Sequence, residues 1–130
     1  MKTALAVILG LGLAGNALWM LASPQAWYQV VPGVAESGPA NGHFIRDIGC
    51  AYLVAALSLL WLARSPKHAW PAALAGGGFL ALHALVHTWD FLAGREPVHQ
   101  LAADLPAVFI PAILTVWLAW PQRREPEMEK

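Results

Sequence analysis

Four apolar runs, each about 20 residues long, constrain the fold of this chain more than any other feature of its sequence. They cover about residues 3–22, 44–63, 70–92 and 98–120. A helix of this length crosses the hydrocarbon core of a bilayer, where every backbone polar group must be satisfied within the segment. The sequence therefore predicts an all-α, integral membrane four-helix bundle. Residues 1–122 form this single domain, and residues 123–130 form a solvated tail.

The composition supports a membrane environment. The chain is 58% apolar and 12% charged, whereas a soluble domain is usually about 25% charged. A globule of 14.0 kDa has too little interior for this apolar excess, so we expect lipid to cover it. The net charge of +0 gives no indication of nucleic-acid binding. The single cysteine, Cys50, excludes an internal disulfide.

The fourth run is the least regular. Counted from Leu105 it has only 16 residues, so its helix is expected to begin near Pro97 or Val98. Pro106 and Pro111 lack the amide hydrogen that a regular helix uses, and we expect them to bend this helix.

The distribution of basic residues predicts the topology. With a cytoplasmic N-terminus, six basic residues lie on the cytoplasmic side and two on the other: Lys2, Arg64, Lys67, Arg123, Arg124 and Lys130 against Arg46 and Arg95. Both termini are therefore expected in the cytoplasm. The N-terminus also resembles a signal peptide, but its apolar run is long for one and no A-x-A site precedes Ser23. We expect the first helix to be retained.

Ionisable residues gather at the outer ends of the second and third helices. The segments "HFIRDIGC" and "HALVHTWD" both place such side chains four and three residues apart, on one helical face. The residues are His43, Asp47 and Cys50, with Arg46 alongside, and His83, His87 and Asp90. Because the two helices are antiparallel, we expect both faces to meet near Glu96, His99 and Asp104.

Ionisable groups within a span usually face a bundle interior or a cavity. We therefore predict one polar cluster that opens outward. It comprises His43, Arg46, Asp47, His83, His87, Asp90, His99 and Asp104.

A metal site is the first interpretation of this cluster. Imidazoles at i and i+4 can share an ion, so the candidate ligands for zinc, copper or iron are His43, His83, His87 and Asp47. No HExxH or paired-cysteine motif supports this site. Haem b between facing histidines is a further alternative, and it would be bound non-covalently because CxxCH is absent.

A purely structural cluster is the competing interpretation. Arg46 would then pair with Asp47, Asp90 or Asp104, and the histidines would hydrogen-bond to carboxylates. Asp104 can also serve as the cap of the fourth helix, ahead of Pro106.

The segments "GPANGHFIRDIGCAYL" and "HALVHTWD" resemble the polar signature of small, uncharacterised bacterial inner-membrane proteins. In size and topology the chain is also similar to the DoxX-like group of four-helix membrane proteins. The resemblance implies a multi-pass protein of the bacterial inner membrane and assigns no functional residue.

The leading hypothesis is a membrane protein whose outward polar cluster binds a metal ion or a small ligand. A structural or accessory membrane subunit is the alternative, and a haem or quinone oxidoreductase is the third. No catalytic motif is present, so we expect a binding or structural protein rather than an enzyme. The expected partners are the lipid bilayer and a small ligand or another membrane protein.

Overall fold

The computed structural model describes residues 1–121, and this part of the chain is helical and contains no β-strand. Four helical stretches are long and apolar enough to cross a membrane, which confirms the all-α prediction. They are α1 (Lys2–Ala22), α3 (Gly42–Arg64), α4 (Pro66–Leu92), and α5 (Val98–Asp104) continued by the π-helix η2 (Leu105–Phe109) and α6 (Ile110–Ala119). The first loop holds α2 (Pro24–Val30) and the 3-10 helix η1 (Ala35–Ser37). The predicted tail, 123–130, lies outside the described residues.

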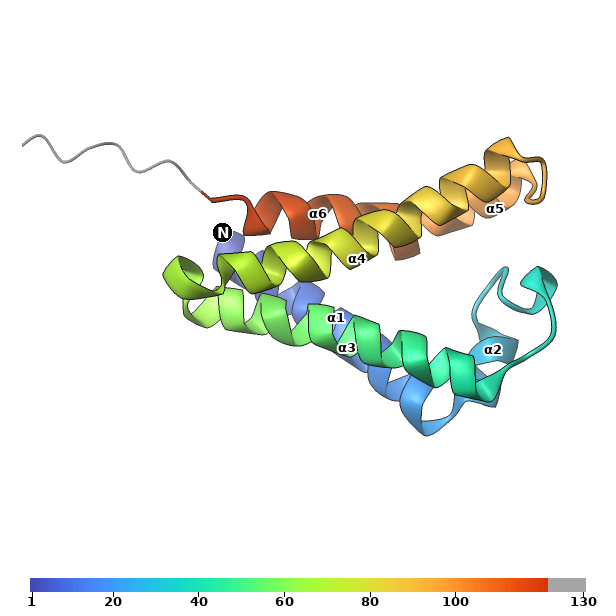
Figure 1. Ribbon diagram of the computed structural model, residues 1–130, viewed down its shortest axis with the longest axis horizontal. Helices are drawn as coiled ribbons and strands as arrows, with labels where there is room; N and C mark the ends of the chain where they lie inside the picture. The colour runs from blue at the N-terminus through green and yellow to red at the C-terminus, as the bar shows by residue number, and fades with distance from the viewer. Residues whose placement is uncertain (122–130) are drawn as a thin grey trace, which may run out of the picture.

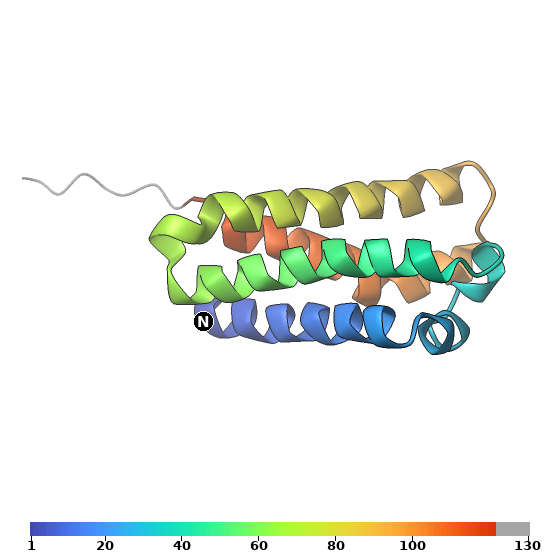
Figure 2. The same ribbon diagram turned by 60° about the horizontal axis from the view of Figure 1, so that its bottom comes forward.

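The four stretches alternate in direction and pack in chain order, α1 on α3, α3 on α4, and α4 on α6 (Figures 1 and 2). The start of α1 also contacts the end of α6, where the Lys2 ammonium lies 4.4 Å from the centre of a Trp117 ring. We call the end that holds Lys2 and the α3–α4 turn the turn end. The opposite end, which holds α2, η1 and the connection from α4 to α5, is the loop end.

Both helices of the central hairpin begin earlier than their apolar runs indicated. α3 begins at Gly42 because the Asn41 side chain accepts hydrogen bonds from two backbone amides of its first turn, each at 3.1 Å. α4 begins at Pro66, since proline suits the first helical position and leaves only Ser65 between the helices. Hydropathy marks the apolar span, whereas capping residues set the ends of the helix.

The fourth stretch is interrupted at its prolines, where a bend was predicted. The amide of Ile110 donates to the carbonyl of Leu105, five residues back, so the helix widens by one residue there. Pro106 and Pro111 flank this bond, and neither can donate a hydrogen bond. The π-helix η2 therefore absorbs the irregularity, and the stretch from Val98 to Ala119 remains helical throughout.

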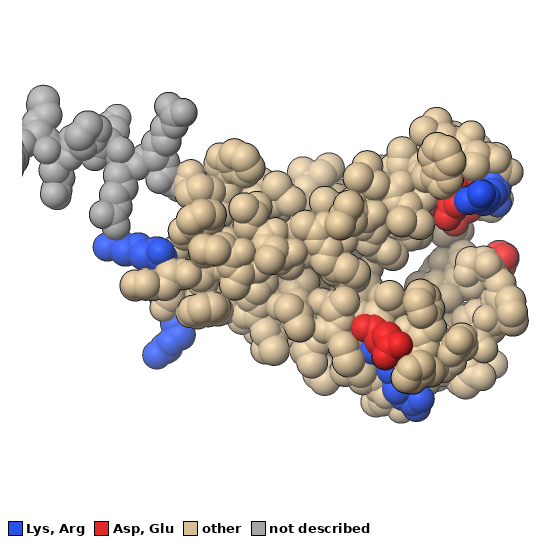
Figure 3. Space-filling model, viewed as in Figure 1, with Lys and Arg blue, Asp and Glu red and all other residues tan. Residues whose placement is uncertain are grey.

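Glycines allow the helices to pack closely over the turn half of the bundle. A Cβ added to Gly76 of α4 would lie 2.9 Å from the Cα of Ala55 in α3. A Cβ on Gly10 of α1 would lie 2.9 Å from the side chain of Leu60. Toward the loop end, by contrast, α4 diverges from α3, and the molecule is hollowed between them (Figures 1 and 3). The polar residues under discussion lie in this divergent half.

Candidate functional site

The polar residues at the start of α3 are turned away from the bundle. Nε2 of His43 lies 3.4 Å from Oδ2 of Asp47, and the two side chains are 88% and 59% exposed. Cys50 is exposed as well. Arg46 donates from Nε to the backbone carbonyl of Leu21 at 3.1 Å, so the predicted pairing of Arg46 with an aspartate was wrong.

The packing face of α3 explains this orientation. Its buried residues include Ile45, Gly49, Tyr52, Ala56 and Leu59. At 3.6 residues per turn this face lies on the opposite side of the helix from His43 and Asp47. The structure therefore does not bring the two predicted polar faces together, because small and apolar residues of α3 take the side that faces its neighbours.

The polar contact that does form links α4 to α5. Nδ1 of His87 lies 2.7 Å from Oδ2 of Asp104, and the two side chains are 22% and 6% exposed. The second oxygen of Asp104 accepts a hydrogen bond from Nε2 of Gln100 at 3.0 Å. Asp104 makes no capping hydrogen bond, so its predicted role as a helix cap was wrong. Its carboxylate instead joins two helices.

Glu96 lies beside His87 and Asp104, although it was not among the predicted site residues. One ligand atom from each of His87, Glu96 and Asp104 lies within 4.8 Å of the other two. The Oε2 atom of Glu96 is buried and has no hydrogen-bond partner among the described residues. The only signal in the sequence is position, since Glu96 lies in the short connection between the helices that carry His87 and Asp104. We call these three side chains the His87 group.

An aromatic series continues from the His87 group into the bundle. The rings of His83 and His87 meet edge to face with centroids 4.8 Å apart. His83 in turn stacks on Phe79 at 6.1 Å and meets the ring of Tyr52 in α3 edge to face at 5.8 Å. His83 is therefore beside the His87 group, with its ring enclosed by aromatic neighbours from two helices.

Two further residues of the predicted cluster stay apart from the His87 group. Asp90 accepts a hydrogen bond from Arg95 at 2.8 Å, which closes the end of α4. His99 is exposed on α5. Of the eight predicted cluster residues, only His87 and Asp104 belong to the group that could hold one ion. The predicted ligands His43, His83 and Asp47 are not part of it.

No family model, curated protein or solved structure matches the chain. The likeness to the DoxX-like group stays a prediction.

The His87 group offers one imidazole and two carboxylates to a ligand. This donor set suits borderline divalent ions such as zinc or ferrous iron. The hydrogen bond between Asp104 and Nδ1 of His87 holds these two donor groups side by side, and a bound ion would take its place. Within residues 1–121, no lysine or arginine pairs with Glu96 or Asp104. The group therefore holds two carboxylates in a partly buried position with no lysine or arginine paired to them.

Proposed function

We propose that this chain is a multi-pass membrane protein that binds a divalent transition-metal ion at its loop end. His87, Glu96 and Asp104 supply the protein ligands, and zinc or ferrous iron fits the donor set. The buried, unpartnered oxygen of Glu96 carries this proposal. A carboxylate oxygen that is removed from water without a hydrogen bond, beside a second carboxylate, is costly unless a cation compensates it.

A small movement of the side chains would bring the three donor atoms to one ion. Zinc binds nitrogen and carboxylate oxygen at about 2.0–2.2 Å, and the three candidate atoms already lie within 4.8 Å of one another. Glu96 sits in a connection, where it can move without disturbing a helix. Water or an added ligand would complete the coordination.

The proposed topology places the turn end in the cytoplasm of a bacterium and the loop end outside its inner membrane. Lys2, Arg64 and Lys67 lie at the turn end, which agrees with the excess of basic residues on cytoplasmic loops. The metal site then faces the outer side of the membrane.

Elemental analysis tests the metal site directly. Protein purified in mild detergent, stripped with a chelator and reloaded with zinc or ferrous iron is expected to retain one equivalent. Glu96→Gln and Asp104→Asn each remove a charged ligand, and we expect the affinity to fall by about 100-fold. An absorption spectrum of the same sample tests for haem, and a Soret band would replace the metal-ligand proposal.

The exposed pair of His43 and Asp47 provides a matched control. It is a second histidine–aspartate pair at the same end of the molecule. The variant with His43→Ala and Asp47→Asn is expected to bind the ion as tightly as the wild type. Equal loss in this control, or full retention in Glu96→Gln, would contradict the proposal.

A structural role is the second candidate, and the bonds of Asp104 favour it. This carboxylate ties α4 to α5 through His87 and Gln100 even without an ion. In chelator-treated protein, Asp104→Asn is therefore expected to lower the free energy of unfolding by about 2 kcal/mol, because His87 loses its partner in a low-dielectric site. Chemical denaturation followed by circular dichroism measures this loss. If the loss appears while no metal binds to the wild type, the structural role stands alone.

A further inference from the structure

The turn end contains a basic cup that the proposed metal site does not use. The cup has a volume of about 560 Å³, and its polar lining comes from Lys2 and Thr3 of α1 and Lys67 of α4. Trp70 and Trp120 complete its walls. Two lysines and a threonine thus line a space of small-ligand size. Such a lining suits an anion.

The charge of this end reinforces that preference. The acidic residues within 1–121 all lie in the loop half of the molecule: Glu36, Asp47, Asp90, Glu96 and Asp104. On the face drawn in Figure 3, the only coloured side chains at the turn end belong to Lys or Arg. The first turns of α1 and α4 border the cup, and helix N-termini carry partial positive charge. Among the described residues, no carboxylate competes for the two lysines at this end.

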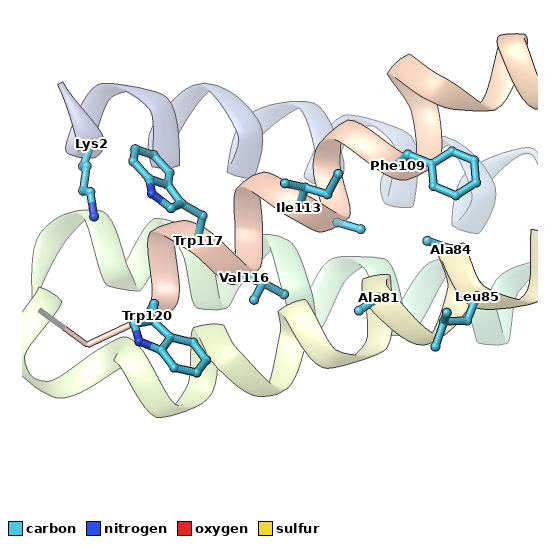
Figure 4. A pocket seen from close by; sticks show the side chains of 10 residues that line it. Lys2, Ala81, Ala84, Leu85, Phe109, Ile113, Val116, Trp117 and Trp120 are labelled. Carbon is cyan, nitrogen blue, oxygen red and sulfur yellow. The ribbon is translucent and has the colours of Figure 1, made fainter. Parts of the chain in front are cut away.

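An apolar groove begins where the cup ends. It has a volume of about 600 Å³ and runs between α4 and α6 from Lys2 and Trp120 toward Phe109 (Figure 4). Its lining is otherwise apolar and includes Ala81 and Ile113. Lys2 and Trp120 line both the cup and the groove, so the two hollows adjoin at these side chains.

The length of the groove matches one membrane leaflet. Phe109 and Trp120 are separated by 11 residues of helix, or about 17 Å at about 1.5 Å per residue. Half of a hydrocarbon core of about 30 Å is about 15 Å. A ligand with an anionic head at Lys2 and an apolar chain along α6 would thus span one leaflet.

We propose that the turn end binds one anionic phospholipid. The phosphate occupies the cup between Lys2 and Lys67, and one acyl chain lies in the groove over Ala81 and Ile113. Lysine ammonium groups bind phosphate as point charges, and basic pockets between membrane helices are suited to acidic headgroups. A free phosphate would satisfy the cup but leave the groove without an occupant.

Native mass spectrometry of the full chain in mild detergent tests this proposal. Phosphatidylglycerol and phosphatidylcholine with the same acyl chains are titrated separately, and we expect one tightly retained phosphatidylglycerol. Each lysine is expected to contribute about 5-fold, so Lys2→Gln with Lys67→Gln weakens phosphatidylglycerol binding by about 25-fold. The matched control removes the same charge at the loop end through Arg46→Gln with Arg95→Gln, and it is expected to bind as the wild type does.

Two further arms separate the headgroup from the chain. Ala81→Leu fills the groove and leaves both lysines in place, so phosphatidylglycerol binding is expected to fall while circular dichroism stays unchanged. Excess inorganic phosphate is not expected to displace the lipid. Equal retention of the two lipids, displacement by phosphate, or unchanged binding in Ala81→Leu would each overturn the proposal.

Discussion

The two ends of the bundle are held together by different forces. At the turn end, Gly10 and Gly76 let helix backbones approach until a single added methyl group would overlap a neighbour. At the loop end, α4 and α5 separate from α3, although α1 and α3 stay closely packed there at Gly49, and a side-chain hydrogen bond joins α4 to α5. In a bilayer no hydrophobic force drives helices together, so close contact and polar bonds must do so. The contact of α4 with α3 at the turn end uses the first of these, and the contact of α4 with α5 at the loop end uses the second.

The difference predicts where the molecule tolerates change. Each polar bond at the loop end involves one or two side chains, such as Trp27 donating to Asn16 at 2.9 Å or Tyr28 donating to the Gly38 carbonyl at 2.7 Å. Any one of them can open without moving a whole helix. At the turn end, by contrast, a larger side chain at Gly10 or Gly76 must move a helix backbone. A ligand-responsive site therefore fits the loop end better than the turn end.

Among the substitutions that test this difference, Gly76→Leu is expected to have the largest effect on the free energy of unfolding. The new Cβ would lie 2.8 Å from Oγ of Ser58 and 2.9 Å from Cα of Ala55, so α3 and α4 must separate. We expect the free energy of unfolding to fall by about 3 kcal/mol. Chemical denaturation in mild detergent, followed by circular dichroism, provides the measurement.

Gly78→Leu is the matched control, because a Cβ on Gly78 meets nothing within 4 Å. It adds the same side chain two residues away and is expected to change stability by less than about 0.5 kcal/mol. Similar losses in both variants would show that the close contact of Gly76 with α3 does not decide the stability of the turn end.

Gly33→Ala is expected to have an intermediate effect at the loop end. Gly33 has a φ of +82°, and an added Cβ would overlap the side-chain amide of Gln100, which bonds to Asp104. We expect a loss of about 2 kcal/mol, about half from the backbone conformation and half from the displaced amide. The same denaturation assay measures it.

Gly94→Ala separates the two contributions. Gly94 also has a positive φ, +69°, but an added Cβ there meets nothing within 4 Å. Its loss is expected to be about 1 kcal/mol, from backbone strain alone. If both alanine variants lose the same stability, Gln100 contributes nothing to holding the loop end.

The helices were predicted correctly from the sequence, while the rotation of α3 about its own axis was not. Length and apolar content act locally, so they identify spans without knowledge of the neighbours. Which side of α3 faces the bundle depends on its small and aromatic residues, such as Gly49 and Tyr52, and these outweighed the pattern of ionisable groups. Reading the small residues as the packing face would have placed His43 and Asp47 outside.

The candidate site was predictable only in part, for a related reason. His87 and Asp104 belong to helices, where spacing predicts which residues share a face. Glu96 lies in an aperiodic connection, and its position depends on the turn at Gly94 and on Pro97. No periodic pattern in the sequence predicts where such a side chain lies.

The smallest expected effect comes from His43→Ala. His43 and Asp47 are spaced i, i+4 on the surface of α3, and exposed pairs of this kind contribute about 0.5 kcal/mol or less. The free energy of unfolding is therefore expected to change by less than about 0.5 kcal/mol, in contrast to Asp104→Asn at the buried pair. A loss from His43→Ala as large as that from Asp104→Asn would mean that exposed polar pairs also hold the loop end. In that case all of the charged residues at the loop end would stabilise it, and not only the few polar bonds that connect its helices.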